Sequence, residues 1–245
     1  MFMNRKKREQ KLKKEQTYGA PLITQLQPKS VIAEQFRTLR TNLEFAQLDK
    51  QVKSILVTSS IPAEGKSTVS SNLAYVLGAV DKKVLIVDAD LRKPTVHRTF
   101  KLNNGKGLTT LLANPELKFN EVVVQSKALG LYLLPSGPLP PNPAELLSSS
   151  RMQRIMQELY SFFDVIIYDA PPMNAVADPQ ILASKVDGVV LVVRQNFVRK
   201  EELRLAKQAL DNVNANILGF VMNDKPVNDS SGYYAYYGHE SEAGE

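Results

Sequence analysis

Residues 60–68, Ser-Ile-Pro-Ala-Glu-Gly-Lys-Ser-Thr, have the residue types and spacing of a phosphate-binding loop. They follow an apolar run and precede a helical pattern, which is the context that a Walker A motif requires. In such a loop the backbone N–H groups surround a phosphate, Lys66 reaches the β- and γ-phosphates, and the Ser67 hydroxyl binds Mg²⁺. Ser60 replaces the first glycine of the motif, so the alternative is a simple turn at a helix start. We predict nucleotide contacts from the loop residues Ala63, Glu64, Gly65, Lys66, Ser67 and Thr68.

Three aspartates stand at the ends of two other apolar runs. Asp88 and Asp90 close the run at 84–88, and Asp169 closes the run at 165–169 in the manner of a Walker B strand. Carboxylates at such strand ends can hold Mg²⁺ or accept a proton from an attacking hydroxyl. The alternative is that they cap helices or form turns. The phosphate-binding loop, the strand that ends at Asp88 and the strand that ends at Asp169 occur in this order along the chain. We therefore predict nucleotide binding, with Ser67, Asp88 and Asp169 as metal ligands.

The elements that must position these residues alternate along the chain. Six apolar runs predict buried strands, at 54–58, 84–88, 131–135, 165–169, 189–193 and 217–222. Helical patterns lie at 31–48, 66–79, 144–162 and 199–213. This alternation predicts the α/β P-loop NTPase fold, a mostly parallel central sheet flanked by helices. Ligands bind such sheets beyond the carboxyl ends of the strands, where all three motifs fall. Asn223, which follows the last run, either contacts an adenine edge or caps a turn.

The net charge of +6 is concentrated at the N-terminus of the 245-residue chain. Residues 1–16 contain seven basic and two acidic side chains, so they carry +5 of it. A basic arm on a near-neutral body is not the footprint of a nucleic-acid-binding domain. The arm is either a solvated tail or a peripheral contact with an anionic membrane surface. The chain has no cysteine for disulfides or thiolate metal sites, and no run approaching about 18 apolar residues, so we expect a cytoplasmic protein.

Four tyrosines cluster near the C-terminus, at Tyr233, Tyr234, Tyr236 and Tyr237. The surrounding segment lacks periodicity and is rich in glycine, serine and glutamate, which predicts a flexible tail over 225–245. Aromatic residues are uncommon in such tails. We therefore interpret the cluster as acceptors for a phosphoryl group, the alternative being an aromatic patch that folds onto the body or a partner.

Taken together, these motifs resemble those of the bacterial tyrosine kinases (BY-kinases), in particular the separate CpsD/CapB-type kinase of capsule and exopolysaccharide loci. Glu34, Arg37 and Arg40 match the family's E-x-x-R-x-x-R oligomerisation motif. The other matching segments are 62–68, the Walker A′ motif at 88–92, the proline-containing segment 140–147, the segment 169–172 and the tyrosine cluster. Ala63 departs from the family, which more often has glycine there; this matters if the position needs a positive φ.

The resemblance implies autophosphorylation of the tail tyrosines, with ATP and Mg²⁺ as co-substrates, and control of polysaccharide synthesis and export. It implies a ring-like homo-oligomer with subunit contacts from Glu34, Arg37 and Arg40. It also implies activation by the cytoplasmic segment of a transmembrane activator or polysaccharide co-polymerase, and hence recruitment to the inner face of the plasma membrane. The expected domains are a basic arm at 1–30, a kinase domain at 31–224 that begins with an oligomerisation helix at 31–48, and the tail.

We expect Lys66, Asp88, Asp90 and Asp169 to be catalytic, with Asp88, either alone or together with Asp90, orienting and deprotonating the acceptor hydroxyl. One rival is a ParA/MinD-like ATPase switch. Such proteins have a second lysine early in the loop, where this chain has Ile61. A second rival is a scaffold that binds ATP only to set its oligomeric state.

Overall fold

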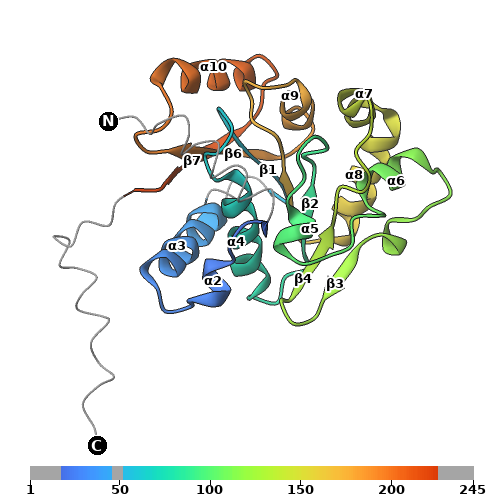
Figure 1. The fold of residues 1–245 in the computed structure, drawn as a ribbon, viewed down its shortest axis with the longest axis horizontal. Helices are drawn as coiled ribbons and strands as arrows, with labels where there is room; N and C mark the ends of the chain where they lie inside the picture. The colour runs from blue at the N-terminus through green and yellow to red at the C-terminus, as the bar shows by residue number, and fades with distance from the viewer. Residues whose placement is uncertain (1–17, 46–51, 226–245) are drawn as a thin grey trace, which may run out of the picture.

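A seven-stranded sheet forms the centre of the protein in the computed structural model, which describes residues 18–45 and 52–225 (Figure 1). The strand order is β3-β4-β2-β5-β1-β6-β7, and every neighbouring pair is parallel except β3 and β4. The strands are β1 (Ser54–Ser59), β2 (Val84–Asp88), β3 (Val124–Ser126), β4 (Leu131–Leu134), β5 (Val165–Asp169), β6 (Gly188–Arg194) and β7 (Ile217–Asn223). All six predicted strands are confirmed. The short, largely exposed β3 was not predicted.

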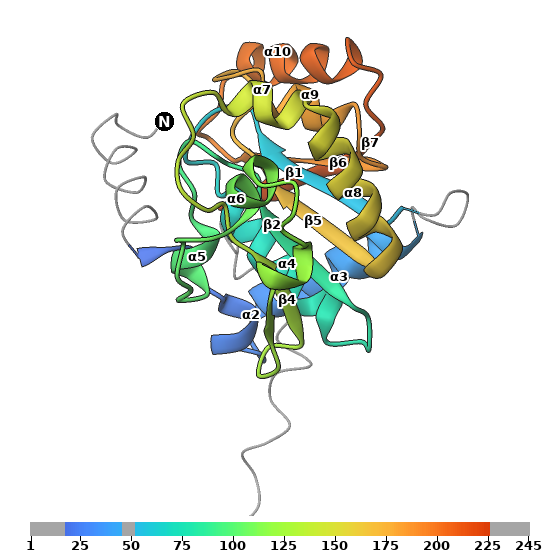
Figure 2. The same ribbon diagram turned by 90° about the vertical axis from the view of Figure 1, so that its right-hand side faces the viewer.

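Helices cover both faces of the sheet (Figures 1 and 2). One face carries α2 (Ile23–Leu26), α3 (Val31–Phe45), α4 (Lys66–Gly78) and α5 (Val96–Thr99). The other carries α6 (Leu108–Ala113), α7 (Pro143–Ser148), α8 (Ser150–Phe162), α9 (Asp178–Ala183) and α10 (Lys200–Asp211). A 3₁₀ turn, η1 (Phe119–Glu121), precedes β3.

Two hydrophobic cores lie on the two sides of the sheet, because successive strand residues point to opposite faces. On β1, Leu56 packs into the core beneath α8, whereas Ile55 and Val57 pack into the core beneath α4. A strand buried on both faces must be apolar at nearly every position, which explains the continuous Val/Ile/Leu runs.

The predicted helix at 144–162 is wrong as a single element, because the structure divides it at Ser149. There the backbone is extended (ψ 154°), and the Ser149 hydroxyl accepts a hydrogen bond from the Met152 N–H. A serine that caps the following helix in this way starts a new helix instead of continuing the old one. Pro143 occupies the first turn of α7, where its missing N–H costs no helical hydrogen bond.

The described part of the predicted basic arm packs against the body of the domain. The backbone N–H and the hydroxyl of Thr24 both donate to Asn72 Oδ1 in α4, at 2.9 Å each. The charged residues 1–16 and the end of the predicted helix at 31–48 lie outside the described residues. Among the helices that the structure describes, none is both long and apolar enough to cross a membrane.

Candidate nucleotide-binding site

The phosphate-binding loop joins β1 to α4 through two residues with positive φ. Gly65 stands at the N-terminal cap of α4 with φ 91°, and Ala63 has φ 70°. The left-handed conformation costs a residue with a Cβ atom about 1–2 kcal/mol. Position 63 therefore does require the backbone conformation that favours glycine, and this chain places an alanine there.

Lys66 and Asp90 form a partly enclosed ion pair at the start of α4. Lys66 Nζ lies 3.0 Å from Asp90 Oδ2 and 3.3 Å from the Ser67 hydroxyl. The other carboxylate oxygen of Asp90 accepts the backbone N–H groups of Arg92 and Lys93. Burial alone would raise the pKa of Asp90, but the Lys66 ammonium and these N–H groups lower it. Asp90 is therefore ionised at neutral pH and already holds the lysine expected to meet the phosphates.

Asp88 and Asp169 are brought together by the register of β2 and β5, in which they are paired residues. Both are completely buried. Asp88 Oδ2 accepts the N–H groups of Thr95 and Val96, and Asp169 Oδ1 accepts the Ser70 hydroxyl at 3.0 Å. Burial raises the pKa of each carboxyl, and Asp169 raises that of Asp88 further.

One oxygen of each of these two carboxyls has no hydrogen-bond partner among the described residues: Asp88 Oδ1 and Asp169 Oδ2. Buried oxygens of this kind are suited to Mg²⁺, which is usually held by one or two carboxylates together with waters and substrate phosphates. No group of three or more acidic, histidine or cysteine side chains suited to a metal occurs in the described part of the chain. Asp88 and Asp169 therefore suit a Mg²⁺ ion that waters and substrate phosphates also hold, rather than a metal site closed by protein ligands alone.

A small cavity of about 180 Å³ opens on one side of the loop. Asp90 lines it, whereas Asp88 and Asp169 do not. Its wall is apolar where the chain turns after β5, through Pro171, Pro172 and Ala175. Ala63 and Gly65 of the loop also line it, together with Lys66 and Ser67 at the start of α4.

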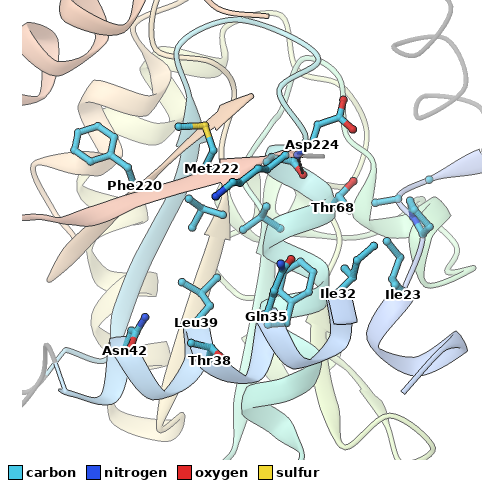
Figure 3. Close-up of a pocket in the computed structure, with 18 of the residues that line it drawn as sticks. Ile23, Ile32, Gln35, Thr38, Leu39, Asn42, Thr68, Phe220, Met222 and Asp224 are labelled. Atoms are coloured by element: carbon cyan, nitrogen blue, oxygen red, sulfur yellow. Dashed lines mark hydrogen bonds between the residues drawn. The ribbon is translucent and has the colours of Figure 1, made fainter. Parts of the chain in front are cut away.

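A larger cavity of about 760 Å³ lies on the other side of the loop, between α3 and the edge strand β7 (Figure 3). Ile32 and Leu39 of α3 line it, and Thr68 lines the end next to the loop (Figure 3). Phe220 and Met222 of β7 border it as well, with their side chains pointing to the side of the strand away from α3 (Figure 3). Asn223 also lines this cavity, and its side-chain N–H donates to the Glu64 carbonyl at 2.7 Å. The phosphate-binding loop therefore separates two cavities of different size.

The Glu64 side chain is directed into the protein, so only its backbone can face a phosphate. Its two carboxylate oxygens accept the N–H groups of Ile61 at 2.8 Å and Arg194 at 3.0 Å. The side chain is fully buried, and this burial raises its pKa. Nothing in its local sequence identifies Arg194 as a site residue; it reaches the loop because it ends β6, the strand that pairs with β1.

Arg92, which follows Asp90, is paired with a carboxylate. Its guanidinium binds both oxygens of the buried Asp178 at the start of α9, at 2.8 and 3.0 Å. Lys93 follows it on the rim of the small cavity.

The three residues of the predicted oligomerisation motif have different surroundings on α3. Arg37 pairs with Glu34 on the exposed side of the helix and also donates to the Pro28 carbonyl. Arg40 instead donates to the Val76 carbonyl of α4 at 3.0 Å. Arg40 therefore anchors α3 to the domain. The predicted acceptors Tyr233, Tyr234, Tyr236 and Tyr237 lie outside the described residues.

The chain is similar in sequence and in fold to several known proteins. Residues 52–219 match the family model described as an AAA domain. The chain is 48% identical to the tyrosine-protein kinase YwqD of Bacillus subtilis (strain 168) over 217 residues, which cover 89% of this chain and 91% of YwqD. Among solved structures, the chimerical protein CapA2B2 superposes with a TM-score of 0.80 at 37% identity, covering 88% of this chain and 99% of that one. A weaker likeness, to the septum site-determining protein MinD of Pyrococcus horikoshii OT3 (TM-score 0.57, 20% identity, 69% of each chain), shows the shared P-loop NTPase fold alone.

Proposed function

The chain belongs to the bacterial tyrosine-protein kinases, and on this premise we propose that it uses ATP to phosphorylate its own tyrosines Tyr233, Tyr234, Tyr236 and Tyr237. The observation that carries the proposal is the position of the Lys66–Asp90 pair, at a phosphate-binding loop with a cavity on either side. One cavity suits the nucleotide that donates the phosphoryl group. The other suits the side chain that accepts it.

ATP binds with its phosphates on the loop amides and on Lys66, and with its base in the larger cavity near Asn223. The buried, unpartnered oxygens of Asp88 and Asp169 support a Mg²⁺ ion held by these residues and Ser67. When bound, Mg²⁺ neutralises charge on the phosphate oxygens. We expect Lys66 to turn from Asp90 toward the phosphates, because several phosphate oxygens together carry more negative charge than one carboxylate.

The acceptor tyrosine enters the small cavity, where the apolar wall of Pro171 and Pro172 suits a phenol ring. Asp90 lines this cavity and becomes available when Lys66 moves. We therefore assign the orientation and deprotonation of the tyrosine hydroxyl chiefly to Asp90, with Asp88 behind it. The unperturbed pKa of tyrosine is near 10, so a carboxylate at the hydroxyl is needed to remove its proton at neutral pH.

The family resemblance supports the cellular part of the proposal. The kinase acts at the inner face of the plasma membrane with the cytoplasmic segment of a transmembrane activator, and it regulates capsular or extracellular polysaccharide synthesis and export. It assembles as a ring-like homo-oligomer through the exposed Glu34–Arg37 pair of α3. The basic arm adds a peripheral contact with anionic lipid.

The test is the intact mass of the protein after incubation with ATP and Mg²⁺. Wild type should gain one or more phosphates, whereas Lys66→Met and a variant with all four tail tyrosines changed to phenylalanine should gain none. Lys106→Met changes an exposed lysine outside both cavities and should behave as wild type. If wild type hydrolyses ATP without gaining mass, even with an activator segment present, the kinase proposal fails and an ATPase switch replaces it.

A further inference from the structure

Arg194 joins three parts of the molecule that are far apart in the sequence. It is the last residue of β6 and is only 7% exposed. Its guanidinium forms an ion pair with Asp224, with Nε 2.7 Å from Asp224 Oδ2, and donates through Nη1 to the Ala63 carbonyl at 3.3 Å. It also lies over the ring of Phe197, with Cζ 4.7 Å from the ring centroid. A buried guanidinium is therefore shared between the phosphate-binding loop and the residue after β7.

The carbonyls of two successive loop residues are held from this side. Arg194 binds the Ala63 carbonyl, and Asn223 binds the Glu64 carbonyl at 2.7 Å. In a planar trans peptide the C=O of one residue and the N–H of the next point in opposite directions. The N–H groups of Glu64 and Gly65 are thereby turned away from Arg194 and Asn223. These are loop amides of the kind that bind phosphate.

The same contacts explain how the loop keeps its unfavourable conformation. Ala63 has φ 70°, and an alanine held there needs surroundings that over-determine its backbone. They come from the bond to its carbonyl and from the neighbouring Glu64, whose buried carboxylate is bound by the Ile61 and Arg194 N–H groups. Arg194 thus acts on the loop through its side chain and its main chain.

The other end of this network is formed by residues 223–225, which come before the segment that contains the four tail tyrosines. We call residues 223–225 the root of this tyrosine segment. Asn223 and Asp224 are ten and nine residues before Tyr233 in the sequence. Asp224 is half exposed and has φ 58°. A displacement of this root would break the Arg194–Asp224 ion pair and the Asn223–Glu64 hydrogen bond at the same time. The Arg194 guanidinium would then lose the Asp224 carboxylate, and the phosphate-binding loop would lose the Asn223 contact that holds the Glu64 carbonyl.

We propose that Arg194 is a positioning residue for nucleotide binding, and that through Asp224 it couples the root of the tyrosine segment to the phosphate-binding loop. Bound nucleotide favours the state in which Asp224 contacts Arg194 and Asn223 contacts Glu64. Loss of these contacts weakens nucleotide binding. Coupling of this kind is reciprocal by thermodynamic necessity. It would let the protein release its nucleotide when the tyrosine segment is drawn elsewhere. This last step rests on the proposed function.

The experiment is calorimetric titration of Mg·ADP into wild type and variants of the full chain. Arg194→Gln should raise the Kd by about tenfold or more, because a small displacement of loop groups is enough to cost that much. Asp224→Asn should raise the Kd by a smaller factor, and Arg194→Lys should fall between Arg194→Gln and wild type. In the double variant Arg194→Gln/Asp224→Asn, the Kd should rise by less than the product of the two single factors. The reason is that each change breaks the same Arg194–Asp224 ion pair. Asp211→Asn, in the exposed Lys207–Asp211 pair, is the matched control and should leave the Kd within about twofold of wild type.

A second readout separates positioning from general stability. Because Asp224 is half exposed, Asp224→Asn should leave the thermal unfolding of the nucleotide-free protein unchanged while its Kd rises. In wild type, saturating Mg·ADP should slow hydrogen exchange at residues 223–225, and this protection should be lost in Asp224→Asn.

Values of Kd within twofold of wild type for both Asp224→Asn and Arg194→Gln would overturn the inference. It would also be overturned if the Kd of the double variant rose by the full product of the two single factors. A wild-type protein that binds no Mg·ADP would instead overturn the proposed function. The two failures are therefore distinguishable.

Discussion

Lys66 Nζ lies 3.0 Å from Asp90 Oδ2, so the lysine of the phosphate-binding loop is already paired with a carboxylate of the next strand–loop segment. The Asp169 and Asp90 carboxylates raise the pKa of Lys66, and Lys66 in turn lowers the pKa of Asp90. In the proposed mechanism this pair opens when the phosphates arrive, and its opening leaves the Asp90 carboxylate available to the acceptor hydroxyl.

Asp90→Asn should separate nucleotide binding from phosphoryl transfer. The variant retains the backbone contacts of the loop but loses the carboxylate, so we expect the transfer rate to fall about 10²–10⁴-fold. The affinity for Mg·ADP should be unchanged or higher, because Lys66 no longer has to leave an ion pair. Phosphate incorporation by mass and titration calorimetry measure the two quantities. Asp81→Asn, at an exposed aspartate outside both cavities, is the control, and equal losses of binding and transfer would contradict the prediction.

Asp88→Asn should stabilise the nucleotide-free protein at neutral pH. Burial raises the pKa of Asp88 in the folded state above its unfolded value near 4. Below the unfolded value both states hold the proton and there is no penalty. As the pH rises above it, the unfolded state releases the proton first, and the folded state loses stability until the folded pKa is passed.

The measurement is urea unfolding of wild type and Asp88→Asn at pH 5 and pH 7 without Mg²⁺. The variant should be more stable than wild type at pH 7, and this advantage should be smaller at pH 5. Added Mg²⁺ and nucleotide should stabilise wild type more than the variant, because the variant has lost a metal ligand. A variant less stable than wild type at pH 7 would show that the two N–H bonds to Asp88 outweigh its buried charge.

Ala63→Gly should relieve local backbone strain. The left-handed conformation costs alanine about 1–2 kcal/mol, and the greater freedom of glycine in the unfolded chain takes back about 0.4–1 kcal/mol. We therefore expect a gain of between zero and about 1.6 kcal/mol in the free energy of unfolding. Ala209→Gly, inside helix α10, should instead cost about 1 kcal/mol. If both variants lose stability equally by denaturant titration, position 63 is not strained.

Arg37→Ala and Arg40→Ala should have different effects although both lie in one motif. Arg37 is on the exposed side of α3, so its removal should reduce the oligomer mass measured by light scattering and leave Tm nearly unchanged. Arg40 binds the Val76 carbonyl, so its removal should lower Tm, by roughly 2–4 °C for each kcal/mol lost in a domain of this size. An unchanged oligomer mass for Arg37→Ala would remove that residue from the proposed subunit contact.

Local patterns in the sequence were enough for the framework of the site. The loop at 60–68, the carboxylates after two apolar runs and the six main strands each depend on a few consecutive residues. They could be predicted because a strand buried on both faces leaves a continuous apolar run, and because a parallel sheet gathers its strand ends at one edge. The expectation that position 63 could need a positive φ was confirmed in the same way.

The partners of individual side chains depended on the tertiary structure. Arg92 meets Asp178 from 86 residues away, Glu64 meets Arg194 from 130, and nothing in either local segment identifies the other. The division of the helix at Ser149 was missed for a similar reason, since its apolar pattern continues across the break. Sequence alone thus determined which chemical groups arrive at the edge of the sheet. Strand register and helix packing decided which of them are paired, buried or open to a cavity, because those contacts join segments that the chain itself keeps far apart.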